Sequence, residues 1–191
     1  MKIKWIGKYF GSNLPVAKVS PNAKAFPVLS TKSSALIVPI IILFVILVWI
    51  KSRILGGIIV TRMYLSVGII IGILMFPLHE LLHALCFPPN SCVFIFFTNQ
   101  GLGTTCLSPI TRNRFILINL IPSVVLGLIP LVSFMWCPKE YIAANSILFS
   151  VSFLHVCGSY VDYINAFRTA KISRHAMIQI SGEQIFWYEM K

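Results

Sequence analysis

A metal-ligand pattern stands inside an otherwise apolar segment of the chain, "PLHELLHALCF" at residues 77–87. Residues 79–83 of this segment have the form H-E-x-x-H. Residues four apart on a helix share one face, so the imidazoles of His79 and His83 can bind one cation, and Glu80 can reach a water on it. Catalytic zinc needs two such neutral imidazoles, a third protein ligand and a position open to water. The pattern therefore predicts a hydrolytic zinc site with Glu80 as the catalytic base.

The third ligand is predicted to be Asp162, the one aspartate in the sequence. It stands in an apolar segment five residues before Phe167, and His83 stands four residues before Phe87. If both segments cross a membrane and end on the same side, these groups lie at one depth. A metal ion would offset the cost of burying the carboxylate. The alternative is a protonated or hydrogen-bonded aspartate.

Three further polar residues are candidates for holding the ligands in place. His155 precedes Asp162 by seven residues, so it points the same way but about 10 Å deeper. We expect it to support the ligands from behind, or to be a satisfied core histidine. Asn165, one turn after Asp162, could hold the carboxylate or a substrate backbone. Asn119 could face the same cleft, or hydrogen-bond between helices.

The composition predicts that much of the chain faces lipid. Hydrophobic residues make up 57% of the 191 residues and charged residues 11%, whereas a soluble domain has about 25% charged residues. A globular protein of this length cannot bury so much apolar surface. Four apolar stretches of suitable length predict transmembrane helices at residues 35–50, 66–87, 114–136 and 143–167. Residues 54–65 remain ambiguous: interfacial, re-entrant, or the first turns of the next helix.

Two other segments have the pattern of short strands. Residues 92–107, "CVFIFFTNQGLGTTCL", are rich in β-branched and aromatic residues on both sides of a glycine-containing turn, which predicts a β-hairpin. The tail has two β-like runs around residues 181–182. The expected fold class is an all-α polytopic membrane protein with about four transmembrane helices, a small β-hairpin between the second and third, and a short β-like tail.

The basic residues predict the orientation in the membrane. The net charge is +11, and twelve of the sixteen Lys and Arg residues lie before the first span, between the second and third, or after the fourth. This asymmetry places both termini of a multi-pass cell-membrane protein in the cytoplasm. The expected division is a basic cytoplasmic segment at 1–34, a transmembrane core at 35–168 and a cytoplasmic tail at 169–191. No nucleic-acid motif accompanies the charge, so we expect the lipid bilayer, and no nucleic acid, as its partner.

The order of these features resembles known families. H-E-x-x-H on one membrane helix, a hairpin, another span and then an Asp is similar to the core of intramembrane site-2-type metalloproteases. A closer resemblance is to a family described as putative zincin peptidases, formerly a domain of unknown function. It rests also on "NLPVAKVSPNAKAF" and "AMIQISGEQIFWY" near the two ends. The resemblance implies Zn²⁺ held by His79, His83 and Asp162, with Glu80 as the base. Site-2 proteases usually have a "DG" motif at the ligand Asp, whereas Tyr163 follows it here.

The expected function is a zinc-dependent membrane-embedded endopeptidase that cleaves a peptide or membrane-protein substrate at or near the cytoplasmic membrane surface. An extended substrate could pair with the hairpin at residues 92–107 as an added strand. The alternative is a non-hydrolytic metal-binding membrane protein, a sensor or a carrier, which needs the ligands but not Glu80. A structural or accessory membrane protein would need neither the ligands nor the base.

Overall fold

The computed structural model describes residues 1–8, 14–29, 31–98 and 101–189. The chain folds as two compact units whose segments alternate along the sequence. The first, here called the site unit, comprises Met1–Ser30, Pro77–Ile121 and Asp162–Lys191. The second, the helical unit, comprises Thr31–Phe76 and Pro122–Val161. Each unit is therefore built from parts of the chain that are far apart in the sequence.

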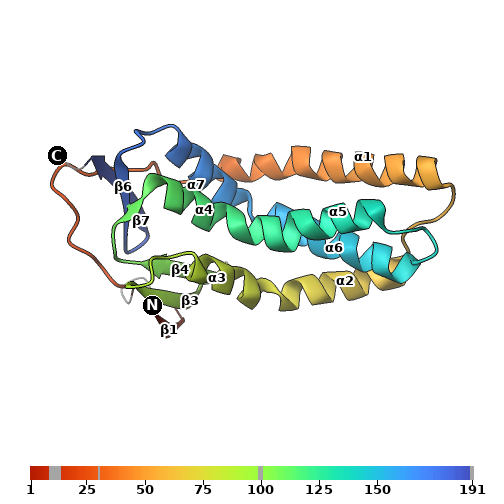
Figure 1. The fold of residues 1–191 in the computed structure, drawn as a ribbon, viewed down its shortest axis with the longest axis horizontal. Coiled ribbons are helices and arrows are strands. Elements are labelled where there is room, and N and C mark those ends of the chain that lie inside the picture. Colours follow the sequence, from red (N-terminus) through yellow and green to blue (C-terminus); the bar gives the residue numbers. More distant parts are fainter. Residues whose placement is uncertain (9–13, 30, 99–100, 190–191) are drawn as a thin grey trace. The chain divides into compact units, whose positions relative to one another are not determined.

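The helical unit consists of long apolar helices (Figure 1). A 3₁₀ turn over Thr31–Leu36 leads into α1, and the chain continues through α2, a π-helical turn over Val124–Leu128, α5 and α6. The bounds of these helices are α1 Ile37–Leu55, α2 Arg62–Leu74, α5 Ile129–Trp136 and α6 Ile142–Gly158. The helix α2 approaches α6 closely because glycine lies at the contact: a Cβ on Gly68 would lie 2.7 Å from the Cβ of Ser150.

A buried lysine connects three helices of this unit. Lys51 in α1 has an exposed fraction of only 2%. Its ammonium donates to the Asn145 side-chain oxygen of α6, at 2.5 Å, and to the backbone carbonyl of Phe134 in α5. The Asn145 amide in turn donates to the carbonyl of Pro138, at 2.7 Å. The charge is thus buried with hydrogen-bond partners, as a buried charge requires.

The described residues of the site unit form two small sheets and three helices. One sheet has the order β1-β3-β4, in which β1 is parallel to β3 and β3 is antiparallel to β4. The other is antiparallel, with the order β2-β7-β6-β5. The strands are β1 Lys2–Lys8, β2 Lys24–Ala25, β3 Cys92–Thr98, β4 Gly101–Cys106, β5 Ile110–Thr111, β6 Ala176–Ser181 and β7 Gln184–Glu189, and the helices are α3 Phe76–Leu85, α4 Arg112–Ser123 and α7 Tyr160–Ala170.

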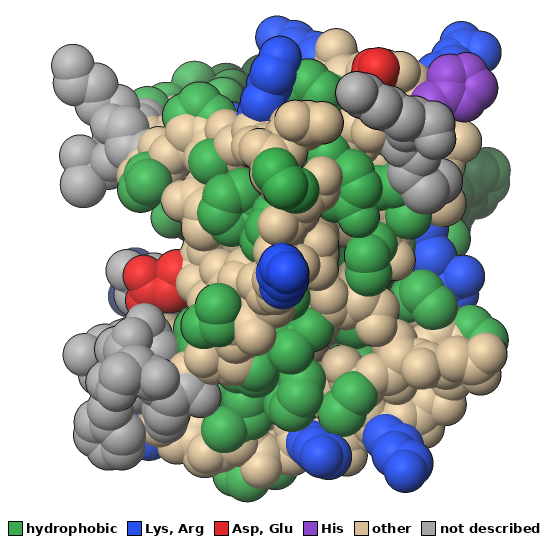
Figure 2. All heavy atoms as spheres, turned by 90° about the vertical axis from the view of Figure 1, so that its left-hand side faces the viewer, with side chains coloured by type: hydrophobic (Ala, Val, Ile, Leu, Met, Phe, Trp, Pro, Cys, Tyr) green, Lys and Arg blue, Asp and Glu red, His purple; other side chains and the backbone are tan. Residues whose placement is uncertain are grey.

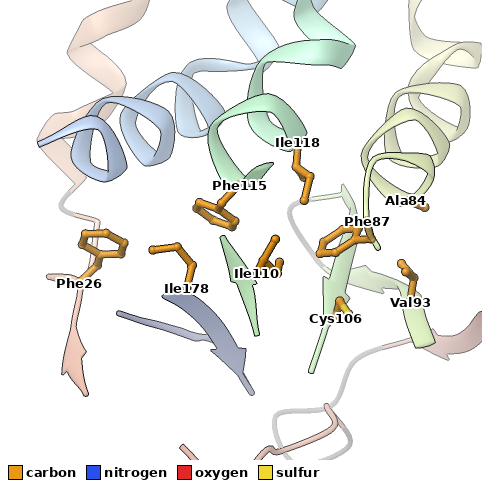
Figure 3. Close-up of a cluster of buried hydrophobic side chains, with 9 residues drawn as sticks. All are labelled: Phe26, Ala84, Phe87, Val93, Cys106, Ile110, Phe115, Ile118 and Ile178. Atoms are coloured by element: carbon orange, nitrogen blue, oxygen red, sulfur yellow. The ribbon is translucent and has the colours of Figure 1, made fainter. Parts of the chain in front are cut away.

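The core of the site unit lies between the helices and both sheets (Figure 3). Ala84 near the end of α3 and Phe87 just after it pack with Phe115 and Ile118 of α4 and with Ile178 of β6. Val93 of β3 and Cys106 of β4 complete the contact with the first sheet. These side chains are almost fully buried, so burial of their apolar surface holds the helices that carry the metal-ligand pattern against the strands.

The segment before β2 is hydrogen-bonded to the end of β6 and to the turn that follows it. The Ser181 hydroxyl accepts from the backbone N–H of Ala17 and donates to its carbonyl, both at 3.1 Å. The backbone N–H of Gly182 donates to the carbonyl of Pro15 at 3.1 Å. The beginning and the end of the described chain thus fold together in the site unit.

The expectation of an all-α protein is wrong. The described residues form a mixed α and β fold, with one sheet of three strands and one of four. The hairpin expected over residues 92–107 is present as β3 and β4, although its turn residues 99 and 100 lie outside the described residues, and the tail forms β6 and β7. The strands β1, β2 and β5, which extend both hairpins into sheets, were not predicted from the sequence. Their pairing is long-range, and two of them have only two residues each, so no local periodicity marks them.

The apolar helices agree in part with the expected spans. By length and hydropathy, two helices in the described chain could cross a membrane, Ser33–Leu55 and Arg112–Trp136. Two more spans arise only if α2 with α3, and α6 with α7, each count as one broken span. Basic side chains lie scattered among apolar ones on the face drawn in Figure 2, where acidic side chains are few. These features are those of a membrane protein with two to four spanning helices.

Candidate metal centre

The helix that carries H-E-x-x-H is short and begins just before the motif. The preceding helix α2 ends at Leu74, and α3 begins at Phe76. Pro77 explains the break, because a proline ring clashes with the carbonyl four residues earlier but fits the first turn of a new helix. His79 and His83 then lie one turn apart on α3, with exposed fractions of 5% and 8%. Their ring centroids are 4.9 Å apart.

The carboxylate of Asp162 comes from the first turn of α7, which begins at Tyr160. The sequence alone predicted one continuous helix here, but α6 ends at Gly158 and a new helix starts. The N-terminal end of a helix carries a partial positive charge from its free N–H groups, which favours a carboxylate. The break therefore places Asp162 where its negative charge is stabilised. Its side chain is 17% exposed.

Three ligand atoms from α3 and α7 converge on one point. The Nε2 atoms of His79 and His83 are 3.2 Å apart, and Oδ2 of Asp162 lies 3.4 Å from the first and 3.6 Å from the second. A tetrahedral zinc with bonds of 2.0–2.1 Å separates its ligand atoms by about 3.3 Å. The donor set and its spacing therefore fit zinc.

The tautomer of His83 is set by a hydrogen bond behind it. Its Nδ1 lies 2.8 Å from the backbone carbonyl of Ile118 in α4. A carbonyl can only accept, so Nδ1 carries the proton, and Nε2 of the neutral ring presents a lone pair to the convergence point. Such bonds behind a ligating histidine orient the ring and raise its basicity. A lone pair facing a carboxylate oxygen is repulsive unless a cation lies between them.

Glu80 adjoins this centre and is oriented by a strand of the first sheet. A ligand oxygen of Glu80 and ring nitrogens of the two histidines lie within 4.8 Å of one another. The Thr104 hydroxyl, on β4, lies 2.8 Å from Glu80 Oε2 and donates to it, and it is also 3.2 Å from the Glu80 backbone carbonyl. A carboxylate at this position could take a proton from a water at the centre.

The other candidate residues have different surroundings. Asn119 in α4 is 5% exposed, and its amide donates to the carbonyl of Phe115 in the same helix, at 2.7 Å. Asn165 is half-buried on α7, one turn after Asp162. His155 is fully buried in α6, with its ring centroid 5.2 Å from that of Phe76. Asn119 is thus bonded within its own helix, while supporting roles for His155 and Asn165 stay predictions.

Two groups that orient residues of the metal centre, the Thr104 hydroxyl and the Ile118 carbonyl, were not identified from the sequence. Any residue can supply a backbone carbonyl, so the sequence carries no signal for Ile118. Thr104 had a weak signal, because it lies in the predicted hairpin that follows the motif helix. Only the packing of β4 against α3 selects it over the neighbouring Thr105.

One of the comparisons with known proteins gives a match. A family model described as "putative zincin peptidase" matches residues 72–177. The matched part is more than half of the chain and contains all of α3, the β3–β4 hairpin and α7. No curated protein matches the chain, and no solved structure does.

Proposed function

Because the chain belongs to the putative zincin peptidase family, we propose that it is a zinc-dependent endopeptidase embedded in a membrane. Its ligands are His79, His83 and Asp162. The observation that carries the proposal is the convergence of two imidazole nitrogens and one carboxylate oxygen at 3.2–3.6 Å. Zinc held there would act as a Lewis acid that activates water and polarises a peptide carbonyl.

Glu80 is the general base and acid of the proposed reaction. Thr104 donates to Oε2 of Glu80, which leaves the lone pairs of Oε1 for the proton of an incoming water. The same carboxyl group then gives this proton to the leaving amine of the cleaved peptide bond. One proton is taken and returned in each cycle, so Glu80 ends the cycle as a carboxylate.

The hydrogen bond between Thr104 and Glu80 favours hydrolysis over the alternative of a metal sensor or carrier. Such a protein needs ligands that bind and release an ion, and it gains nothing from a carboxylate fixed beside them. A base must instead lie within hydrogen-bond reach of the proton that it removes. The bond from β4 restricts the Glu80 side chain to one orientation, which serves a reaction and not ion release.

The proposed substrate is a peptide segment in extended conformation. In the first sheet, β4 is paired on one side only, with β3, among the described residues. A free strand edge can bind an extended peptide through backbone hydrogen bonds. Because Thr104 of β4 contacts Glu80, a peptide paired with β4 would pass close to the base. Soluble loops and unwound segments of membrane proteins both have this chemistry.

We propose that cleavage takes place near the cytoplasmic surface of a cell membrane that the chain crosses several times, with both termini inside. The apolar helices Ser33–Leu55 and Arg112–Trp136 support membrane crossing. The excess of Lys and Arg before the first span and after the last supports the orientation. A site near the surface would also give water access to the metal.

The metal content of the detergent-purified protein tests the proposal. We expect about one zinc per chain by elemental analysis, strongly reduced in Asp162→Ala, because one of three ligands is lost. His155→Ala removes a buried histidine that is not one of the three ligands, so it should keep about one zinc per chain when zinc is in excess. A wild-type protein without zinc, even after zinc addition, would contradict the proposal.

A second variant separates a peptidase from a metal sensor or carrier. Glu80→Gln keeps the shape and the hydrogen-bonding capacity of the side chain but removes its basicity. The peptidase proposal predicts that this variant binds zinc as the wild type does and cleaves no peptide. If it retained wild-type cleavage, Glu80 could not be the base.

A further inference from the structure

Two neighbouring arginines at the start of α4 bind the ends of both ligand-bearing helices. Arg114 donates from Nε to the carbonyl of Cys86, at 2.9 Å, and from Nη2 to that of Phe87, at 3.2 Å. These carbonyls follow directly after α3, which ends at Leu85. Carbonyls just beyond a helix C-terminus have no partner within the helix, so a side chain can satisfy them.

Arg112 makes the corresponding contacts with α7. Its Nε donates to the carbonyl of Thr169, at 3.1 Å, and its Nη2 to that of Ala170, at 2.6 Å. Ala170 is the last residue of α7. Each guanidinium thus spans two successive carbonyls at a helix C-terminus, where a positive charge also interacts favourably with the helix dipole.

The spacing of the two arginines explains why they reach different helices. Residues two apart on a helix point about 200° from each other around its axis. Arg112 and Arg114 lie in the first turn of α4, so their side chains leave α4 in opposite directions, one towards α7 and the other towards α3. The Ile118 carbonyl, one turn after Arg114, accepts from His83. Hence α4 contacts α3 in two places, through Arg114 at the C-terminal end of α3 and through the Ile118 carbonyl at the ligand His83.

We propose that Arg112 and Arg114, called here the arginine pair, set the separation between the histidines on α3 and Asp162 on α7, and thereby the affinity for the metal. This inference rests on the proposed function only in its assignment of the metal ligands. The two arginines are positioning residues, since neither contacts a ligand atom. In the sequence they counted only as positive charges that orient the chain in the membrane; the structure assigns them hydrogen bonds that a charge alone does not provide.

The physical basis is the narrow tolerance of a three-ligand zinc site. The ligand atoms of α3 and α7 are 3.4 and 3.6 Å apart, and zinc bonds vary by only about 0.2 Å. A small shift of α7 along or away from α3 would carry Asp162 out of the coordination sphere. Rigid caps on the two helix ends, both held by one short stretch of α4, resist that shift.

Arg→Lys substitutions test the arginine pair. Lysine keeps the positive charge, and with it the topology signal and the dipole interaction, but it lacks the rigid planar fork by which the guanidinium reaches two successive carbonyls from different nitrogens. The zinc affinity of purified Arg112→Lys and Arg114→Lys is measured by competition with a chelator, and cobalt absorption spectra report the coordination geometry. Arg174→Lys is the matched control, because Arg174 lies in the exposed turn after α7.

We expect each lysine variant to bind zinc about tenfold more weakly, as is typical when a group that orients a metal ligand is lost. The cobalt spectrum should also lose intensity, because a displaced carboxylate changes the tetrahedral geometry. A merely structural loss of stability would lower the yield of folded protein without changing the spectrum of the folded fraction. The control variant should equal the wild type in both measurements.

Wild-type affinity and spectra in both lysine variants would overturn the inference while leaving the zinc site intact. A wild-type protein that binds no zinc would instead overturn the proposed function. If Arg112→Lys yields no folded protein, the zinc affinity and cobalt spectrum of Arg114→Lys test the inference, because that substitution acts on the other ligand-bearing helix. Arg112→Gln, which keeps a planar amide donor but is shorter and uncharged, supplies a second variant at the first position and should also bind zinc more weakly than the wild type.

Discussion

The hydrogen bond that orients the base can be removed almost without a change of shape. Thr104→Val replaces the hydroxyl by a methyl group and leaves Oε2 of Glu80 without its donor at 2.8 Å. A hydrogen bond to a charged group contributes about 1.5–3 kcal/mol. Because both side chains are only half-buried, we use the lower part of this range, about 1.5–2 kcal/mol. Only the part of this energy that holds Glu80 in its reactive orientation changes the rate; at 1.36 kcal/mol per factor of ten, kcat/KM should fall by at most about 10- to 30-fold.

The neighbouring residue provides a matched control. Thr105, also on β4, is 4% exposed, and its hydroxyl has no hydrogen-bond partner in the part of the chain that the structure describes. Successive side chains of a strand point to opposite faces, so Thr105→Val makes the same chemical change away from Glu80. It should leave activity unchanged and stability equal or higher, because a buried unpaired hydroxyl is replaced by an apolar group.

The assay is zinc-dependent cleavage of a mixture of internally quenched peptides, with zinc content measured on the same samples. Thr104→Val should keep its zinc, and Thr104→Ser, which retains a hydroxyl, should recover most of the lost activity. Equal losses of activity in Thr104→Val and Thr105→Val would show that activity depends on the integrity of the strand and not on the Thr104 hydroxyl. Full activity in Thr104→Val would refute the role of this bond in orienting Glu80.

Three other outcomes follow from the fold and the site. Zinc at a hundred times its Kd should stabilise the protein by about 2.7 kcal/mol, so chelation lowers its thermal midpoint, whereas His79→Ala should show little such shift. Substrates with single N-methylated amides should lose cleavage at alternate positions if the peptide pairs with β4; a uniform loss would contradict strand pairing. Gly68→Ala would bring its Cβ within 2.8 Å of the Ile147 Cα, so chemical denaturation should show a loss of about 1–3 kcal/mol. Gly158→Ala, whose nearest contact is 3.4 Å, should cost less.

The sequence by itself determined the features that depend on neighbouring residues. The spacing of His79 and His83 places both rings on one face of any helix, whatever surrounds it. The long apolar stretches predict helices whose side chains are buried in lipid or in a protein core, because water is unfavourable for them. The β3–β4 and β6–β7 hairpins are also local, since each pairs two strands separated by a short turn.

The tertiary structure alone decided how these pieces meet. The parallel partner of β3 is β1, about ninety residues earlier, and no local pattern encodes such a pairing. The breaks before α3 and α7 were also absent from the predicted spans, although Pro77 offered a signal for the first. Because of the second break, Asp162 lies at a helix N-terminus, an arrangement that a continuous span would not give.

One physical reason explains why the sequence predicts some of these features and not the others. Hydrophobic periodicity and motif spacing report which side of an element is apolar and which residues share a face, and both are properties of a few turns of chain. The hydrogen bond of Thr104 to Glu80, and those of Arg112 and Arg114 to helix ends, join groups 24 to 58 residues apart. Their acceptors are a carboxylate and backbone carbonyls, which become specific partners only when folding brings them within about 3 Å.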